Sequence, residues 1–338
     1  MKRVIYAKKG GLDSIDFVDE DVPSPSSGQV RVEVHRAGIN FADLMMRQGL
    51  YGAAPDFPFT PGYEISGIVQ ELGDDVDGLS IGDRVVALTG FGGYAEQVVV
   101  DQQRVWPLPD NVSFGAAAAM PVTYLTAYHM LVYLGNFKAG DSILVHHAAG
   151  GVGTATAQLA KALKSGNVYG TASANKADFV EAQGMIHIPR GDDFVKRIKD
   201  DIGGVHHALD PVGGKHVMDS YRALRNGGRL YVFGASSAVK GPKRSMLTAI
   251  NMWRTTPRFD PIRMMNSNKA VFGVHMGMWK DEEVARQHML KLAEMMETGQ
   301  IDPIIDSVYR FEDVVLAQKH IHDRGNRGKV LLDFSPVN

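Results

Sequence analysis

The sequence contains no cysteine among its 338 residues. Disulfide bonds, cysteine nucleophiles and cysteine-based zinc sites are therefore excluded, and this composition fits a reducing compartment. Long apolar runs are also missing. The longest run of small apolar residues, 116–122, is too short to cross a bilayer and contains Pro121. Because residues 1–6 enter a strand pattern directly, we expect no signal peptide and a cytoplasmic location.

A large excess of charge of either sign is absent as well. Lys and Arg together number 36 and Asp and Glu 38, which gives a formal net charge of −2. This balance argues against wholesale binding to nucleic acid. Hydrophobic residues make up 44% and charged residues 22%, as in ordinary globular proteins, and the length suits two domains.

The pattern of the chain changes near Thr123. Before this point it reads as strands and turns, with residues 30–35 alternating at period two. After it, strands and helices alternate, which predicts an α/β domain with a doubly wound parallel sheet. The expected strands are 143–146, 168–171, 186–188, 207–210, 229–233 and 270–274, with helices that include 176–183 and 217–224. A helix over 281–298 and strands at 308–311 and 329–332 form a tail that we expect to return to the first domain.

One turn in this second part predicts a dinucleotide site. A short apolar strand (142–145) runs into small residues with the spacing Ala148-x-Gly150-x-x-Gly153, and a helix over 154–164 follows. Small side chains let the backbone approach a pyrophosphate, and a helix N-terminus offers N–H groups to it. We therefore expect the cofactor phosphates to bind at Gly150, Gly151, Val152 and Gly153. The alternative is a glycine turn that only packs a helix against a strand.

The next strand end bears on the choice between NADH and NADPH. An NAD site usually has an acidic residue about twenty residues past the turn, where this chain has Ser173 and then Lys176. A hydroxyl and an ammonium group bind a 2′-phosphate that a carboxylate would repel. These residues favour NADPH. The alternative for Lys176 is a solvated lysine on the following helix.

Several segments resemble one family over nearly the whole chain. They are residues 37–44, 47–51, 61–64, 82–85, 125–128 and the Ala148 turn. In this order they resemble the zinc-free quinone oxidoreductases of the medium-chain dehydrogenase/reductase superfamily. Within that family the chain is most similar to the vesicle amine transport proteins and their bacterial relatives, on segments 40–51, 170–176, 210–214, 241–244 and 304–308.

The resemblance implies a fold, a partner and a metal content. It implies a GroES-like β-rich catalytic domain (1–122 and 277–338) and a Rossmann NADPH-binding domain (123–276). The family forms homodimers through edge strands of the Rossmann sheets, here within 271–276. Zinc-dependent relatives carry Gly-His-Glu where this chain has Gly62-Tyr63-Glu64, so we expect no metal. The adjacent pairs His146-His147 and His206-His207 are not obvious chelates, because neighbouring strand residues point to opposite faces.

The resemblance also implies roles for individual residues. Asn40 would lie beside the nicotinamide, Tyr51 would donate to a substrate carbonyl, and Tyr63 would line the same pocket. Further cofactor contacts would come from Thr126, Phe233, Gly234, Ser236, Phe272, Val274 and Asn326. Arg190 follows a proline that replaces a tyrosine of many relatives, and it is a candidate for the 2′-phosphate. The chain also has His147 where relatives often have alanine.

Two of these residues, and the nearby Asp43, have plainer interpretations. Asn40 could satisfy turn backbone, Tyr51 could be a packed loop aromatic, and Asp43 is better explained as a local cap or ion-pair partner than as an acid. No proton donor is assigned, because water can protonate a hydroquinone or an enolate.

The stretch 238–269 departs most from the family. It carries seven basic residues and one acid, Asp260, and Met246, Ile250 and Trp253 recur at helical spacing. Its basic members are Lys240, Lys243, Arg244, Arg254, Arg258, Arg263 and Lys269. One interpretation is a patch that meets an anionic membrane or a lipophilic quinone. We favour the other, a helix whose apolar face caps the cleft while its charges are solvated.

These observations predict an NADPH-dependent oxidoreductase that passes hydride to a quinone or an α,β-unsaturated carbonyl. Such acceptors develop negative charge on an oxygen, which hydrogen-bond donors can stabilise without a metal. Two alternatives stay open: an enoyl-thioester reductase, and an NADPH-binding interaction protein with little turnover.

Overall fold

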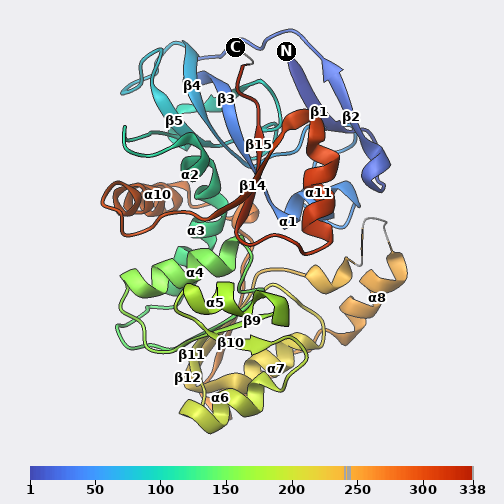
Figure 1. Cartoon of the computed structure of the whole chain (residues 1–338), viewed down its shortest axis with the longest axis vertical. Helices are drawn as coiled ribbons and strands as arrows, with labels where there is room; N and C mark the ends of the chain where they lie inside the picture. The colour runs from blue at the N-terminus through green and yellow to red at the C-terminus, as the bar shows by residue number, and fades with distance from the viewer. Residues whose placement is uncertain (240, 242–244, 337–338) are drawn as a thin grey trace. The chain divides into compact units, whose positions relative to one another are not determined.

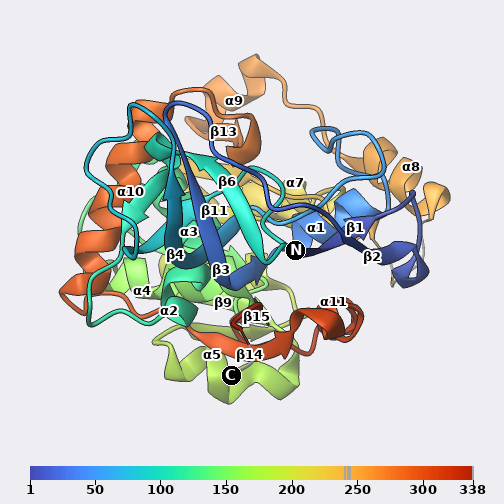
Figure 2. The ribbon, with the colours of Figure 1, turned by 90° about the horizontal axis from the view of Figure 1, so that it is seen from above.

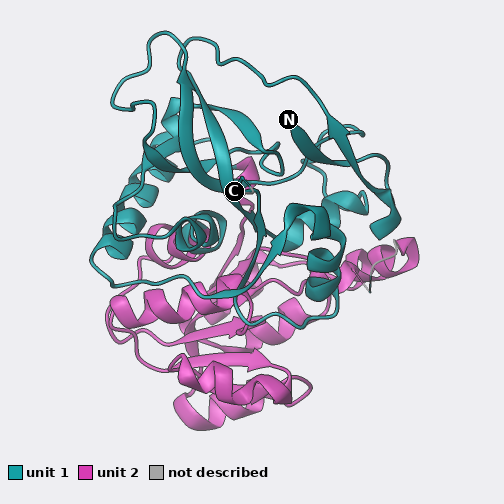
Figure 3. Ribbon diagram, turned by 45° about the horizontal axis from the view of Figure 1, so that its top comes forward, with its two compact units in different colours: residues 1–125, 241–244, 279–338 teal, residues 126–240, 245–278 magenta. Residues whose placement is uncertain are grey.

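The computed structural model describes residues 1–239, 241 and 245–336, so the basic residues Lys240, Lys243 and Arg244 lie outside the described part. The chain divides into two compact units (Figure 3). Unit 1 comprises residues 1–125, 241–244 and 279–338, and unit 2 comprises residues 126–240 and 245–278. Among the described residues, no helix is both long and apolar enough to cross a membrane.

Unit 1 is built on a seven-stranded sheet in the order β14-β15-β3-β4-β5-β7, with β6 paired to β3. Figure 2 labels β3, β4, β6, β14 and β15 of this sheet. Its strands are β1 (Lys2–Tyr6), β2 (Ile15–Asp19), β3 (Gln29–Ile39), β4 (Glu64–Leu72), β5 (Arg84–Leu88), β6 (Gln97–Asp101), β7 (Val105–Pro107), β14 (Ile305–Arg310) and β15 (Lys329–Asp333). Its longer helices are α1 (Phe41–Arg47), α2 (Phe114–Ala119), α3 (Pro121–Tyr128, which runs into unit 2), α10 (Glu282–Glu297) and α11 (Val314–His322). All pairs in this sheet are antiparallel except β14 with β15.

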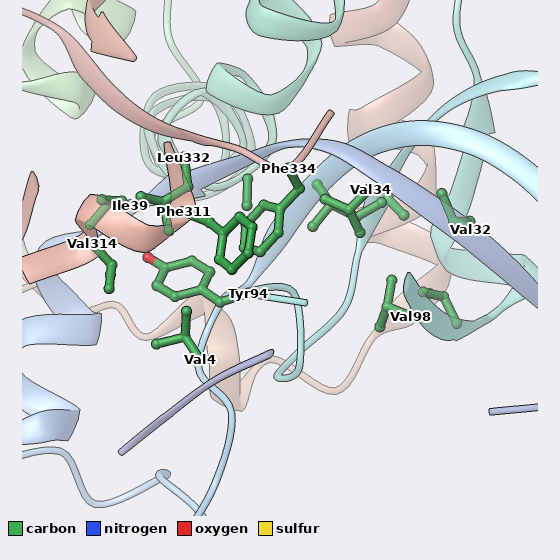
Figure 4. Packing of buried hydrophobic residues seen from close by; sticks show 14 of the residues in the cluster. Val4, Val32, Val34, Ile39, Tyr94, Val98, Phe311, Val314, Leu332 and Phe334 are labelled. Atoms are coloured by element: carbon green, nitrogen blue, oxygen red, sulfur yellow. The ribbon is translucent and has the colours of Figure 1, made fainter. Parts of the chain in front are cut away.

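The core of unit 1 follows from the alternation in β3. Val30, Val32 and Val34 are fully buried, while the polar residues between them are partly exposed. Burial of each such side chain contributes roughly 1.5–3 kcal/mol. Strand β15 pairs with β3, which brings the chain end back to the first domain as predicted and adds the stacked rings of Phe311 and Phe334 to the core (Figure 4).

Unit 2 contains a six-stranded, fully parallel sheet in the order β10-β9-β8-β11-β12-β13. Its strands are β8 (Ile143–His146), β9 (Val168–Ala172), β10 (Ile186–Pro189), β11 (Val205–Asp210), β12 (Leu224–Val232) and β13 (Ala270–Gly273). Its longer helices are α4 (Gly151–Ala162), α5 (Ala177–Ala182), α6 (Phe194–Ile202), α7 (His216–Ala223), α8 (Met246–Thr255) and α9 (Pro261–Ser267). The order reverses between β8 and β11, as in doubly wound dinucleotide-binding sheets.

Helices cover both faces of this sheet (Figure 1). Helices α4 and α5 pack on β8, β9 and β10, and α7 packs on β11 and β12 with α6 beside it. Strands covered on both faces are apolar throughout, and β8 is accordingly buried at all four positions. The doubly wound parallel sheet predicted from the sequence is therefore confirmed. Short 3₁₀ and π segments complete the chain: η1 (Leu12–Ser14), η2 (Gln102–Arg104), η3 (His129–Leu134), η4 (Ala174–Lys176), η5 (Ser236–Ala238), η6 (Met276–Met278) and η7 (Phe311–Asp313).

Candidate active site

The turn between β8 and α4 has the geometry of an anion-binding helix start. Gly150 is the N-cap of α4, and Gly151, Val152 and Gly153 form its first turn, whose N–H groups have no partner within the helix. A Cβ on Gly153 would lie 2.3 Å from the carbonyl oxygen of Ala148, so only glycine fits this close approach. His147, where relatives often have alanine, adopts a left-handed φ of 55°.

The end of β9 carries the residues predicted to bind the 2′-phosphate. Ser173 follows β9 at the N-cap position of η4, and its hydroxyl donates to the side chain of Asn175, at Oδ1, across 2.7 Å. Lys176 is only 8% exposed, so the alternative of a solvated lysine is wrong. Arg190 is exposed, and its backbone N–H donates to the Ala172 carbonyl, which places it beside the end of β9.

Backbone hydrogen bonds join the segments that follow β11 and β12. The N–H groups of Phe233 and Ser236 donate to the carbonyls of Asp210 and Pro211, at 3.1 and 3.0 Å. A Cβ on Gly234 would lie 2.7 Å from the Pro211 carbonyl oxygen, so this segment also needs glycine for close packing.

The end of the edge strand β13 lies beside the end of β12. Phe272 of β13 stacks on Tyr231 with ring centroids 5.6 Å apart, and Val274 donates its N–H to Val232. The residues of unit 2 that were predicted to bind the cofactor therefore all lie at the carboxyl ends of its parallel strands. They are the residues of the turn, Ser173, Lys176, Arg190, the 233–236 segment, Phe272 and Val274. Ligands bind at this edge in open α/β sheets.

In unit 1 the side chain of Asn40 belongs to a buried network. Its amide nitrogen donates to Glu64 Oε1 at 2.8 Å, and its amide oxygen accepts from Lys329 Nζ at 2.6 Å. Lys329 Nζ also lies 2.5 Å from Glu64 Oε1. The acid on one side and the ammonium on the other allow only one orientation of the amide.

Glu64 has a second anchor. Its Oε2 accepts the backbone N–H of Val122 at 2.6 Å, and its side chain is fully buried. Lys329 is only 4% exposed, so the pair forms a buried salt bridge whose polar atoms are hydrogen-bonded. Because the Asn40 side chain binds Glu64 and Lys329, the alternative that it only forms hydrogen bonds to the backbone of a turn does not hold.

Asp43 has the structural role that the sequence favoured. Its Oδ2 accepts the backbone N–H of Asn40 at 2.8 Å and the hydroxyl of Tyr94 at 2.7 Å, which caps α1. Burial raises the pKa of Asp43 to about 6, and the hydrogen bond from Tyr94 opposes that rise. Asp43 therefore holds the start of α1 in place, next to Asn40.

An aromatic cluster surrounds Tyr51 and Tyr63. The two rings lie 6.5 Å apart edge to face, and Tyr63 also packs on Phe91 at 5.4 Å and against the buried Met46. Burial raises the pKa of both phenols, and the two hydroxyls are hydrogen-bonded to each other. The Tyr63 hydroxyl also donates to Met46 Sδ at 3.9 Å. Both phenols stay protonated at neutral pH and can act as hydrogen-bond donors.

Thr126 and Asn326 are the last two residues predicted to contact the cofactor. Thr126 is buried near the end of α3, and the Asn326 side chain donates to the Gly328 carbonyl at 3.0 Å, one residue before Lys329.

The apolar side chains of α8 are exposed. Met246, Ile250 and Trp253 are 49%, 48% and 71% exposed, and Leu247 is 83% exposed. The prediction of a helix here is confirmed. That its apolar face caps the cleft stays a prediction. Spacing identifies a helix face without identifying what it packs against.

Sequence reasoning missed the roles of Glu64, Lys329 and Tyr94. Glu64 and Lys329 lie in quoted motifs, but they are 265 residues apart and nothing local links them. One signal was available: an acid and a lysine within otherwise apolar strands can be buried only if they find partners.

Comparison with known proteins identifies the family. Residues 26–110 match the alcohol dehydrogenase GroES-like domain, and residues 180–332 match the family described as zinc-binding dehydrogenase. The synaptic vesicle membrane protein VAT-1 homolog of Danio rerio is 37% identical over 341 residues, which cover 99% of this chain and 70% of the relative.

Two solved structures agree over nearly the full length of both chains. The human synaptic vesicle membrane protein VAT-1 homolog-like protein superimposes with a TM-score of 0.86 at 33% identity, covering 100% of this chain and 99% of the other. The Escherichia coli quinone oxidoreductase complexed with NADPH gives 0.86 at 27% identity, covering 98% and 100%. The chain therefore belongs to the medium-chain dehydrogenase/reductase superfamily, among its quinone oxidoreductase-like members and close to the VAT-1 homologues.

Proposed function

We propose that the protein is an NADPH-dependent, zinc-independent oxidoreductase that transfers hydride to a quinone or an α,β-unsaturated carbonyl. One observation carries the proposal: the glycine turn at the start of α4 is followed by Ser173 and the buried Lys176 instead of an acidic residue. The NADPH complex of the E. coli quinone oxidoreductase supports the same choice of cofactor.

The cofactor residues act through backbone groups and charge. The first turn of α4 would hold the pyrophosphate, and Ser173, Lys176 and Arg190 would hold the 2′-phosphate. We assign Asn40, Thr126, Phe272, Val274, Asn326 and the segment with Phe233, Gly234 and Ser236 to the nicotinamide half. NADPH supplies a hydride when bound, and the chain supplies its position and the surrounding dipoles.

Asn40 is well suited to orient a carboxamide or an acceptor. Glu64 takes one of its two amide N–H groups, and the second has no hydrogen-bond partner among the described residues. Since Lys329 fixes the amide from its oxygen side, the second N–H has a defined direction. A donor held in this way needs no reorganisation during the reaction.

Tyr51 and Tyr63 are the proposed donors to the acceptor oxygen. Tyr51, whose hydroxyl is hydrogen-bonded with that of Tyr63, would direct its proton to an oxygen that gains negative charge. The proton that completes the hydroquinone or the carbonyl product comes from water. Zinc has no role in this proposal, because Tyr63 stands at the ligand position and both Glu64 oxygens are engaged.

NADPH consumption with a panel of quinones and enones tests the proposal. Turnover with these acceptors supports it. Turnover confined to enoyl thioesters would select the thioester reductase instead, and tight NADPH binding without any turnover would select the interaction protein.

We further propose a homodimer through β13. This strand is the outer edge of the unit 2 sheet, and no described strand pairs with its far side. Light scattering coupled to gel filtration should give twice the chain mass of 36.8 kDa, and a mass of one chain would contradict the dimer.

A further inference from the structure

Three side chains of metal-ligand type converge in unit 2. His146 ends β8, Asp210 ends β11, and His216 begins α7. One ligand atom from each lies within 4.8 Å of the other two, and no other such group of three occurs among the described residues. The pair His146-His147 is no chelate by itself, but the fold joins His146 to two residues more than 60 positions away.

The distances in this cluster are close to those of a tetrahedral metal site. Asp210 Oδ2 lies 2.9 Å from His216 Nδ1. The Ser220 hydroxyl oxygen, on α7, lies 2.6 Å from Asp210 Oδ2, 3.1 Å from His146 Nε2 and 3.4 Å from His216 Nδ1. Ligand atoms about 2.0–2.1 Å from a zinc ion are roughly 3.3 Å from one another.

Outer contacts aim the ligand atoms toward the same point. His146 Nδ1 is 2.8 Å from the Thr171 hydroxyl, which leaves Nε2 to face the cluster. Asp210 Oδ1 accepts the backbone N–H groups of Val212 and Gly213 at 2.7 and 3.1 Å, which leaves Oδ2 to face it. Metal-binding histidines and carboxylates are commonly oriented in this way by a second layer of hydrogen bonds.

The charge and exposure of the cluster also suit a cation. The Asp210 side chain is fully buried. His216 is the only cationic type of side chain within ion-pair distance of Asp210 in the described part of the chain, and it is 27% exposed. A buried carboxylate thus lies behind an accessible imidazole.

We propose that His146, Asp210 and His216 bind one divalent ion of the Zn²⁺, Co²⁺ or Ni²⁺ class, with the Ser220 hydroxyl or a water as fourth ligand. Neutral imidazoles and one carboxylate are ligands that these ions accept. The site is distinct from the catalytic zinc position of dehydrogenases, where this chain has Tyr63. An ion there would join β8, β11 and α7, so we assign it a stabilising role.

Titration of the chelator-treated full chain with Co²⁺ tests the site, because tetrahedral Co²⁺ has strong visible absorption bands. We expect one equivalent to bind the wild type with these bands and to raise its melting temperature. His216→Gln should weaken binding at least tenfold and abolish that rise. His206→Gln is the matched control, because His206 is similarly exposed and touches Asp141 instead. It should bind like the wild type.

Two results would overturn the proposal: no binding of one equivalent to the wild type, or equal binding by wild type and His216→Gln. Because His216 is at the edge of the cluster, its variant is expected to fold, and the melting temperatures without metal verify this. Asp210→Asn, checked by circular dichroism, is a second ligand variant. If it folds and binds Co²⁺ as tightly as the wild type, the cluster is only a hydrogen-bonded network.

Discussion

The amide nitrogen of Asn40 donates to the buried carboxylate of Glu64 across 2.8 Å, and this bond links the proposed nicotinamide residue to an ion pair in the core of unit 1. The pair joins the start of β4 to the start of β15. The position of Asn40 thus depends on a residue 289 places later in the chain.

Removing one partner of this pair should be strongly destabilising. Lys329→Met leaves the Glu64 charge buried without its cation, which costs about 3–5 kcal/mol of unfolding free energy. Urea denaturation of wild type and variant measures the change. Lys319→Met is the control, since Lys319 pairs with Asp323 on the surface and should contribute at most about 1 kcal/mol. A loss below 1 kcal/mol for Lys329→Met would contradict a structural role for the buried pair.

The proposed donor pair predicts loss of activity without loss of fold. Tyr51→Phe should lower kcat/KM for a quinone about 10- to 100-fold, because a donor to the developing oxyanion is removed. Steady-state kinetics at saturating NADPH give the value, with the exposed Tyr133→Phe as the unchanged control. Equal rates for Tyr51→Phe and wild type would remove Tyr51 from the mechanism.

The raised phenol pKa values also predict how activity depends on pH. Burial keeps Tyr51 and Tyr63 protonated beyond the ordinary phenol range, so kcat should not fall near pH 10 through loss of these protons. A pH–rate profile for kcat provides the test. A decline that disappears in the Tyr51→Phe variant would show that the phenol ionises earlier than the buried geometry allows.

Cofactor preference should depend on Lys176. Replacing Lys176 by alanine removes a charge-assisted hydrogen bond to the 2′-phosphate, which we expect to raise the Kd for NADPH about 10- to 100-fold. The Kd for NADH should change little, because NADH lacks that phosphate. Fluorescence titration with both cofactors measures this, and Lys196→Ala, on the surface of α6, is the control. Equal weakening of NADH and NADPH would contradict the assignment.

Acid should destabilise unit 1 through His322. The fully buried Arg47 lies 2.7 Å from His322 Nε2, and burial followed by the Arg47 charge lowers the pKa of His322 to about 4. An unfolded histidine titrates near 6.5, so the unfolded chain takes up the proton first. The contribution of the neutral imidazole is complete above about pH 6.5 and is lost as the pH falls toward 4.

Measuring the free energy of unfolding between pH 7 and 4 tests whether acid destabilises the protein through His322. The free energy of unfolding of the wild type should fall more steeply with acid than that of His322→Gln, which cannot titrate. Replacement of the exposed His275 is the control, and it should leave the dependence of the unfolding free energy on pH as in the wild type. Identical slopes for wild type and His322→Gln would mean that Arg47 does not hold the imidazole neutral.

Periodic features were readable from the sequence because local rules govern them. The parallel strands of unit 2, the glycine turn and the alternation of β3 all appear where local patterning placed them. The cap made by Asp43 was predicted for the same reason, since it spans three residues.

Features that depend on distant segments were not readable in the same way. Glu64 and Lys329 meet only because β15 pairs with β3, and His146 meets Asp210 only because β8 lies beside β11. Helical spacing predicted α8, but it says nothing about what the exposed apolar side chains of this helix pack against.

NADPH-dependent reduction of quinones and enones is tested most directly by the steady-state oxidation of NADPH and NADH by the purified protein with a panel of these acceptors. We expect turnover of these acceptors and at least a tenfold preference for NADPH in kcat/KM. Absence of turnover with every quinone and enone, although NADPH binds, would contradict it.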